Sequence, residues 1–265
     1  MWVRSQTSHC CVICLIVCFA EKAISQVLTG SISQGVVVNY QFNGSAADSS
    51  GNGYHATAIG AQLTADRFGR ASSSYLFNGS SDYIICGNAL PDSSSFTISA
   101  WIRPDSLRFA GIFYDSAFFT PGRDTSLHMF SDGSLETQFS KISDPGPPYL
   151  KTSPILLAGL WAHVVTTSSA AGIKIFVNGS EVAGQDVGSH NISYHSSIYI
   201  GAENHGFNPE YFFHGAIDDV LFYERNLSEA EVSLLYQTQS IPEPSALSLL
   251  SVALGGLAMM RRRRS

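Results

Sequence analysis

Two acidic segments far apart in the chain carry side chains that could bind a hard cation. The first is the glycine-rich loop from Asp48 to Gly53, and the second is the pair Asp218-Asp219. Calcium takes about six to eight oxygen ligands, which carboxylates, asparagine side chains and loop carbonyls can supply. In the alternative interpretation, Asp48 caps a turn and Asp218 faces solvent. A metal ion held here would be structural rather than catalytic.

Two aromatic loops are candidates for contact with a ligand. One combines the segment around Phe119 with the segment around Tyr149, and the other contains Phe207, Tyr211 and Phe212. Aromatic faces can stack on sugar rings or peptide segments, and loops on a rigid scaffold often carry function. In the alternative interpretation, some of these rings complete the core.

Catalysis has little support in the sequence. A glycoside hydrolase needs two carboxylates roughly 5 to 10 Å apart, but no Glu-x-Asp-x-x-Glu run occurs. Glu203 and Glu210 border an aromatic loop, and we interpret them as solvated loop residues. The His-Glu-x-x-His and Gly-x-Ser-x-Gly motifs are absent from the sequence, and we expect His163 to pack or form a hydrogen bond. We therefore expect no enzymatic activity.

The composition favours short strands joined by tight turns. Hydrophobic residues make up 45% of the chain and charged residues only 14%, with 23 glycines. The net charge is -6, and the only basic cluster is at residues 261–264, which argues against nucleic acid as a partner. Cys86 is the one cysteine outside the first apolar stretch, and we expect it to be a buried structural thiol.

Between about residues 33 and 237, apolar residues recur mostly with a period of two, and turn signals interrupt them. This pattern predicts a sandwich of antiparallel strands. Asn-Gly and Asp-Gly turns predict three hairpins, formed by residues 74–77 with 82–86, 126–130 with 135–139, and 173–177 with 181–183. Further strands are predicted at residues 36–42, 96–103, 112–114, 161–167, 198–202 and 216–223.

One helix is predicted to begin after Ser228. Ser228 and Glu231 have the spacing of a capping box, and Leu227 and Val232 have that of a hydrophobic staple. We expect the helix to run to about Tyr236 and to pack on the sandwich.

Several segments of the body, taken in order, resemble the laminin-G-like jelly rolls of bacterial surface proteins. They read YQFNG at 40–44, DSSGNG at 48–53, LFNG at 76–79, FTISAWI at 96–102, WAHVV at 161–165, IFVNG at 175–179 and FHGAIDDV at 213–220. The resemblance spans nearly all of residues 26–237. It implies an all-β, two-sheet antiparallel jelly roll of the concanavalin A-like or laminin G-like type, with one short C-terminal helix. In similar domains calcium commonly bridges the two acidic segments, which implies Asp48, Asn52 and Asp218 or Asp219 as ligands of a structural calcium ion.

Residues 1–25 are predicted to be a cleavable secretory signal peptide. Arg4 precedes an apolar run at residues 11–20, and the small residues Ala23 and Ser25 follow. This is the charged, apolar and small-residue order of such signals.

Residues 238–265 resemble the PEP-CTERM sorting signal. Pro242, Glu243 and Pro244 precede an apolar segment at residues 246–260, and the cluster Arg261, Arg262, Arg263 and Arg264 follows it. The resemblance implies an exosortase-type processing enzyme as partner. A helix of about 15 residues spans roughly 22 Å, short of the ~30 Å hydrocarbon core, which suits a transient insertion into the inner membrane. A permanent single-span transmembrane anchor is the alternative, and either keeps the arginines cytoplasmic.

Together these features predict an exported, non-catalytic binding module. Its ligand would be a carbohydrate or protein in the extracellular or exopolysaccharide matrix. Export across the inner membrane would leave it extracellular or on the cell surface after removal of the tail. The alternative function is a polysaccharide-active glycoside hydrolase of concanavalin A-like fold, because fold alone does not settle activity.

Overall fold

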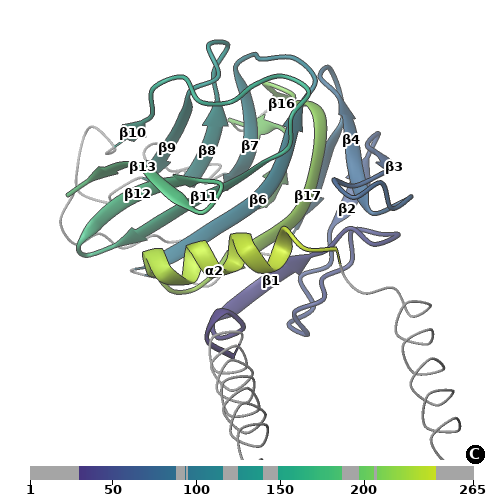
Figure 1. The fold of residues 1–265 in the computed structure, drawn as a ribbon. Coiled ribbons are helices and arrows are strands. Elements are labelled where there is room, and N and C mark those ends of the chain that lie inside the picture. The colour runs from purple at the N-terminus through teal and green to yellow at the C-terminus, as the bar shows by residue number, and fades with distance from the viewer. Residues whose placement is uncertain are drawn as a thin grey trace, which may run out of the picture.

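Two antiparallel β-sheets stack on one another, and helix α2 lies against one of them (Figure 1). The computed structural model describes residues 30–87, 93, 95–115, 125–139, 149–186, 197–205 and 208–242. The eight-stranded sheet has the order β13-β12-β11-β6-β17-β4-β3, and β1 also pairs with β17. The seven-stranded sheet has the order β10-β9-β8-β7-β14-β5-β2, and β15 and β16 form a two-stranded ribbon. The predicted all-β jelly-roll architecture is confirmed.

The strands have the following bounds. The eight-stranded sheet contains β1 (Val36–Tyr40), β3 (Gln62–Thr64), β4 (Ser74–Asn78), β6 (Phe96–Pro104), β11 (Ala162–Ser169), β12 (Gly172–Val177), β13 (Ser180–Gln185) and β17 (His214–Tyr223). The seven-stranded sheet contains β2 (Thr57–Ile59), β5 (Tyr83–Cys86), β7 (Ala110–Asp115), β8 (Thr125–Met129), β9 (Leu135–Phe139), β10 (Tyr149–Lys151) and β14 (Ile198–Ile200). The ribbon is formed by β15 (Glu203–Asn204) and β16 (Pro209–Glu210).

The main core lies between the two sheets. Successive side chains of a strand point to opposite faces, so alternate residues of each sheet meet in this layer. Phe222 of β17 stacks on Phe96 and on Phe113 of β7, which joins the two sheets through aromatic contacts. Cys86 is buried and its Sγ donates to the Tyr54 carbonyl, so the prediction of a buried structural thiol is confirmed.

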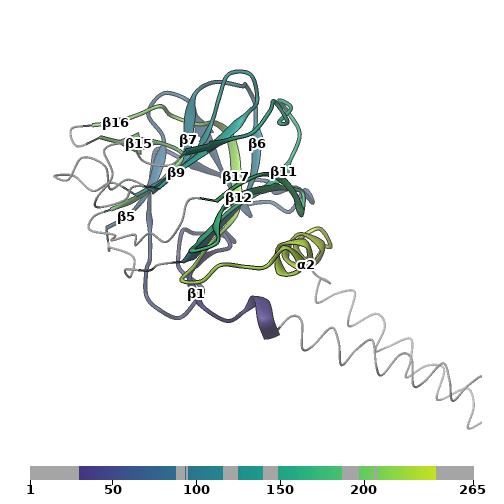
Figure 2. The ribbon, with the colours of Figure 1, turned by 90° about the vertical axis from the view of Figure 1, so that its left-hand side faces the viewer.

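Helix α2 (Glu229–Gln239) packs on the outer face of the eight-stranded sheet (Figures 1 and 2). The predicted capping box between Ser228 and Glu231 is present, and the helix continues to Gln239, past the predicted end. Val232 and Leu235 form a second apolar cluster with sheet residues that include Phe176. An apolar cluster on this outer face therefore holds the helix.

Two of the three predicted hairpins are confirmed, and one is wrong. Strand β8 pairs with β9, and β12 pairs with β13. Strands β4 and β5 lie in different sheets, so the Asn78-Gly79 turn connects the two layers. The Asn78 side chain accepts from the Ser80 and Ser81 amides, and Asp82 accepts from the Asn78 amide. These bonds form a turn without requiring that the flanking strands pair.

In the described part of the chain, no helix combines the length and the apolar character that a membrane span requires. The predicted signal peptide at residues 1–25 lies outside that part, as do Glu243, Pro244 and the arginine cluster. Pro242 is the last described residue. The signal peptide, the sorting tail and the transmembrane segment therefore stay predictions.

Candidate functional site

Asp48, the first predicted calcium ligand, organises its own loop. Its carboxylate accepts hydrogen bonds from the amides of Asn39 (3.0 Å), Ser50 (2.9 Å) and Tyr54 (3.0 Å), and from the Ser50 hydroxyl (2.7 Å). Burial acts to raise the pKa of Asp48, but these hydrogen bonds outweigh it and hold the pKa below its usual range. The carboxylate thus stabilises the loop by accepting hydrogen bonds from three backbone amides.

Asn52, the second predicted ligand of this loop, faces strand β1. Its Nδ2 donates to the carbonyls of Val36 (3.1 Å) and Val37 (3.0 Å). Side-chain hydrogen bonds therefore fasten the loop to the first strand.

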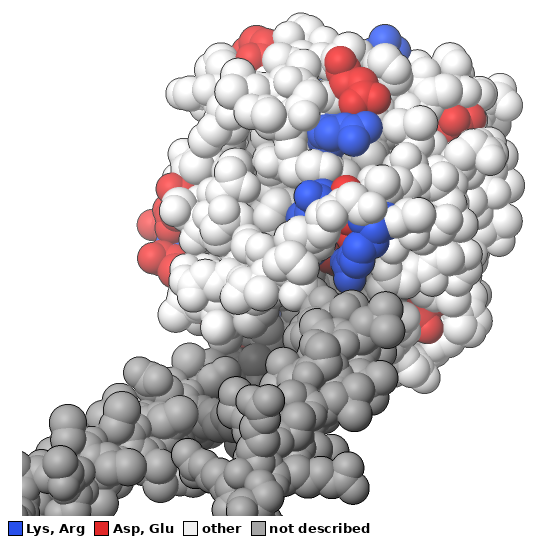
Figure 3. All heavy atoms as spheres, turned by 45° about the vertical axis from the view of Figure 1, so that its right-hand side comes forward, with Lys and Arg blue, Asp and Glu red and all other residues white. Residues whose placement is uncertain are grey.

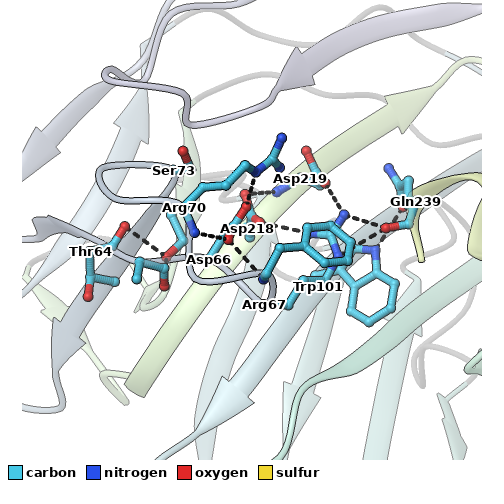
Figure 4. A network of polar contacts seen from close by, with 12 residues as sticks. Thr64, Asp66, Arg67, Arg70, Ser73, Trp101, Asp218, Asp219 and Gln239 are labelled. Carbon is cyan, nitrogen blue, oxygen red and sulfur yellow. Dashed lines mark hydrogen bonds and ion pairs between the residues drawn. The ribbon is translucent and has the colours of Figure 1, made fainter. Parts of the chain in front are cut away.

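Asp218 and Asp219 form ion pairs with Arg67 (Figure 4). Arg67 Nη1 lies 2.8 Å from Asp218 Oδ2, and Nη2 lies 2.7 Å from Asp219 Oδ2. The Asp218 side chain is only 1% exposed, so the alternative in which it faces solvent is wrong. Burial and the charge of Asp219 raise the pKa of Asp218, and the guanidinium of Arg67 acts against them.

A break in strand register explains how two consecutive aspartates reach one arginine. Asp218 pairs with Trp101 of β6, but the register shifts before Leu221, which marks a bulge or irregularity in β17. Asp219 has a positive φ of 45°, and its amide donates to Asp218 Oδ1 (2.8 Å). Neighbouring residues of a regular strand point to opposite faces, and a bulge re-aims them.

Arg67 also binds the end of α2 and lies near two aromatic rings. Its Nε and Nη2 donate to the Gln239 carbonyl at 3.1 and 2.7 Å, next to the end of α2. Its guanidinium lies 4.4 Å from the ring centroid of Trp101 and 4.6 Å from that of Phe68. The indole of Trp101 in turn donates to Gln239 Oε1. We call Arg67, Trp101, Asp218, Asp219 and Gln239 the Arg67 cluster.

His163 lies next to this cluster and is fully buried. Its Nε2 lies 2.8 Å from the Ser99 hydroxyl, and its ring packs against Trp101 and Tyr236 of α2. Burial, with a smaller contribution from the charge of Arg67, lowers the pKa of His163 to about 3. The prediction that His163 packs or forms a hydrogen bond is confirmed, and the neutral ring has a structural role.

The residues predicted to bind calcium fit that ion poorly. Asp48 accepts four hydrogen bonds, and Asp218 and Asp219 face a guanidinium that a divalent cation would have to approach or displace. Within the described ranges, no group of three or more His, Cys, Asp and Glu residues is placed to hold a metal ion. Calcium binding stays a prediction, and the observed donor set does not favour it.

The predicted aromatic ligand contacts are only partly visible. Phe119 and Phe207 lie outside the described residues. Tyr149 is 64% exposed in β10, at the edge of the seven-stranded sheet. Phe212 is half-buried, whereas Tyr211 is 44% exposed. Of these predicted contacts, Tyr211 lies beside a further group of polar side chains.

That group surrounds the carboxylate of Glu203 in β15. Glu203 Oε1 lies 3.1 Å from His128 Nδ1, and Oε2 lies 2.9 Å from His205 Nε2. Glu210, paired with Glu203 across the ribbon, lies 3.9 Å from the same His205 nitrogen. Glu203 is 1% exposed, whereas the side chains of His205 and Glu210 are 46% and 50% exposed. The group therefore reaches from the protein interior to solvent.

Two tyrosines complete this group. Tyr114 Oη lies 3.1 Å from His205 Nδ1, so a neutral His205 can donate to Glu203 and accept from Tyr114. The ring of Tyr211 lies 6.1 Å from that of His205 and packs on Phe109 at 4.8 Å. We call Tyr114, His128, Glu203, His205, Glu210 and Tyr211 the Glu203 cluster.

Strand register places the Glu203 cluster on the outer face of the seven-stranded sheet. Tyr114 pairs with Tyr199 of β14 and Ser126 of β8, whereas the neighbouring Ile198 and Leu127 belong to the core. Paired residues of antiparallel strands share a face, so Tyr114 and Tyr199 point away from the core. His128, two residues after Ser126, lies on the same face.

A glycine and a buried histidine position Glu203. A Cβ at Gly111 of β7 would lie 2.7 Å from Glu203 Cγ and 2.8 Å from the Ala202 carbonyl oxygen, so only glycine allows this approach without movement. Burial, with a further effect of His205, lowers the pKa of His128 to about 4. A neutral His128 therefore lies beside the Glu203 carboxylate.

The interpretation of Glu203 as a solvated loop residue is wrong, whereas Glu210 is exposed as expected. The sequence shows a polar Glu-x-His alternation at Glu203 and His205, which is typical of any short strand. His128 and Tyr114 come from other strands, and no spacing in the sequence links them to Glu203. The group could be found only from the fold.

Two stacked antiparallel sheets with this strand order define a jelly-roll sandwich. The chain belongs to the Laminin_G_3 family of the concanavalin A-like lectin/glucanases superfamily, which it matches over residues 78–233. No curated protein has a matching sequence.

Several solved structures share this fold. The receptor-binding domain of botulinum neurotoxin D aligns with a TM-score of 0.59 and 18% identity, over 78% of this chain and 54% of that chain. This chain therefore spans about half the length of the toxin domain. Domain 4 of the extracellular arabinanase AbnA from Geobacillus stearothermophilus, solved with arabinotriose, has a TM-score of 0.57 and 22% identity, over 76% and 98%. A pentraxin from Limulus polyphemus has a TM-score of 0.51 and 22% identity, over 61% and 80%.

Charged side chains do not form a basic stripe on the face shown in Figure 3. Basic and acidic atoms lie close together there, and most of the surface carries neither. Arg70 pairs with Asp66 and Arg103 with Asp105, in addition to the pairs of Arg67. This mixed pattern differs from the clustered cations that bind nucleic acid.

Proposed function

We propose that this domain is a non-catalytic binding module that takes a carbohydrate at the Glu203 cluster. The observation that carries the proposal is the combination of a half-exposed Tyr211 ring with the exposed polar groups of His205 and Glu210. A flat ring can cover the apolar face of a sugar, and carboxylate and imidazole groups can hydrogen-bond its hydroxyls. The Glu203 carboxylate holds His205 in position below this surface.

Family membership supports a binding role. Among similar structures, one arabinanase domain was solved with arabinotriose, and a botulinum neurotoxin D domain was solved with N-acetylneuraminic acid. Each of these ligands is a sugar, although the identities of 22% and 18% extend only the fold to this chain. The alternative within this proposal is that the same surface binds a protein instead of a carbohydrate.

A glycan array probed with the purified protein tests the carbohydrate form. We expect binding to a restricted set of oligosaccharides and loss of that binding in a Tyr211→Ala/His205→Ala variant that melts like the wild type. Binding to no glycan, or equal binding by the variant, would contradict the proposal. If the wild type pulls down an envelope protein and the double variant still does so, the binding surface lies elsewhere on the domain.

A glycoside hydrolase is the second candidate, because Glu203 and Glu210 both lie within 3.9 Å of His205 Nε2. Two carboxylates that flank a glycosidic bond are the minimum for this chemistry. Glu203 is 1% exposed and lies between two imidazoles, which favours binding over attack. Reducing-sugar release from the glycans bound on the array, abolished by Glu203→Gln and by Glu210→Gln, would establish the enzyme instead.

We further propose that the module is exported and sorted by its tail. Pro242, Glu243 and Pro244, the apolar segment and the four arginines support processing by an exosortase-type enzyme after transient insertion into the inner membrane. The mature protein would then act in the extracellular matrix or on the cell surface. Mass spectrometry of the secreted protein should find new termini near residues 25 and 242. Full-length protein retained in the inner membrane would contradict this route.

A further inference from the structure

We infer that Arg67 is the resident cation of the Asp218 and Asp219 pair. Its guanidinium occupies the place for which the sequence predicts calcium, and the domain keeps its fold without a metal ion. This inference does not depend on the proposed ligand. It rests on the geometry of the carboxylate pair, on the enclosure of the guanidinium and on the state of the Asp48 loop.

Each terminal nitrogen of the guanidinium faces one oxygen of a different carboxylate. Nη1 and Nη2 lie 2.8 and 2.7 Å from the nearest oxygens of Asp218 and Asp219, the distances of charge-assisted hydrogen bonds. The planar fork of an arginine provides two parallel donors, which a lysine cannot. A calcium ion bound to the same two oxygens would lie against a fixed positive charge.

The surroundings keep the guanidinium in this position. The Arg67 side chain is 7% exposed and lies near the rings of Trp101 and Phe68, and its Nε and Nη2 donate to the Gln239 carbonyl. Moving Arg67 away would leave two carboxylates, one of them fully buried, without a counter-charge. A buried charge that loses its partner is strongly destabilising. The arginine is therefore an integral part of the fold.

The first acidic segment is also satisfied without a metal ion. Asp48 accepts from three backbone amides and one hydroxyl, and Asn52 donates to the backbone of β1. Protein donors thus satisfy the Asp48 carboxylate, and a guanidinium joins the Asp218 and Asp219 pair to the end of α2. The two tasks that one bridging calcium ion would perform are divided between internal hydrogen bonds and Arg67.

Thermal unfolding of the wild-type protein, with millimolar calcium and after treatment with EDTA, tests the inference first. We expect the same Tm under both conditions, and no heat of calcium binding in a calorimetric titration. A rise of the Tm with calcium, or binding of calcium that Asp218→Asn abolishes, would overturn the inference.

Substitution of Arg67 tests whether its charge is needed to compensate Asp218 and Asp219. Arg67→Gln should lower the Tm by roughly 10 °C, because it leaves buried carboxylates unpaired. Arg103→Gln is the matched control: its pair with Asp105 is more exposed, at 28% and 35%, and the Tm should move by about 2 °C or less. An Arg67→Gln protein as stable as Arg103→Gln would overturn the inference.

If Arg67→Gln does not fold, a triple variant keeps the test decisive. Arg67→Gln/Asp218→Asn/Asp219→Asn removes the cation and both carboxylates together, so no unpaired charge remains. We expect the triple variant to fold and to melt above the single variant. Failure of the triple variant to regain stability would show that charge compensation is not the role of Arg67, and would overturn the inference.

Discussion

The Arg67 cluster and the Glu203 cluster each bury one carboxylate to 1% exposure, yet the partners of the two carboxylates differ. Asp218 pairs with a guanidinium that is 7% exposed and always charged, whereas Glu203 lies between two imidazoles, one of them 46% exposed. A fixed and enclosed counter-charge holds elements together. Partners that are titratable and partly in solvent leave groups that a ligand can still contact. Burial of a charge alone therefore does not identify a functional site.

The largest expected effect lies in the Arg67 cluster. Asp218→Ala leaves Arg67 buried with one carboxylate and should cost about 3 to 5 kcal/mol of unfolding free energy, measured by urea denaturation. Asp105→Ala, which removes the exposed partner of Arg103, should cost less than about 1 kcal/mol. Equal losses in the two variants would remove the distinction between an enclosed and an exposed ion pair.

The second largest effect is the pH dependence of stability that the two buried histidines, His163 and His128, cause. The pKa of His163 is about 3, below that of an unfolded histidine, so the unfolded chain takes up the proton first. The stability due to neutral His163 is present above about pH 6.5 and is lost as the pH falls, by about 1.4 kcal/mol per unit.

His163→Gln should therefore gain stability relative to the wild type between about pH 6.5 and pH 4, by roughly 3 kcal/mol. Asp218, whose pKa burial raises, makes the opposite contribution to the pH dependence, and the comparison with the wild type cancels it. His128→Gln should show the same sign over a narrower window, because the pKa of His128 is about 4. Parallel pH profiles of variant and wild-type proteins in denaturant melts would refute the neutral, buried state of these rings.

A smaller effect is expected where strand β7 meets Glu203. Gly111→Ala places a methyl group 2.7 Å from Glu203 Cγ, so Glu203 and its ribbon must shift, at a cost of about 1 to 3 kcal/mol. Gly87→Ala is the control, because a Cβ there meets nothing within 4 Å and its φ is not positive. The Gly111 variant should also bind glycan more weakly. Unchanged stability and unchanged binding would show that Glu203 does not need this close approach.

The smallest expected effect concerns the exposed ring. Tyr211→Ala should weaken glycan binding about tenfold, the loss of one stacking contact, and should leave Tm almost unchanged. Leu157→Ala, at an exposed apolar residue in another loop, should leave the affinity the same. An affinity lost equally in both variants, measured by calorimetry, would count against the specific role of Tyr211.

The sequence predicts the architecture well because its signals are local. Period-two alternation locates the long strands, and the capping box locates the start of α2. The Asn78-Gly79 turn shows the limit of such signals: the residues determine a turn, but they do not determine whether β4 and β5 pair. That choice depends on which strands fill the two sheets, and this is a property of the whole chain.

The two clusters were predictable only in part, because long-range contacts create them. The acidic pair at Asp218 and Asp219 was visible as a cation site, but the cation comes from Arg67, far earlier in the chain. Glu203 and Tyr211 stood near each other in the sequence, whereas His128 reaches them only because β8 lies two strands from β14. The residue types suggested charged and polar sites, but the sequence did not show which residues would contact one another.

An NMR titration of the labelled protein with the oligosaccharide that binds most tightly on the array tests the central claim most directly. The account predicts that backbone amide shifts concentrate at His205, Glu210 and Tyr211, while the amides of Arg67 and Gln239 stay unchanged. Shifts confined to the Arg67 cluster, or no saturable shifts at all, would contradict it.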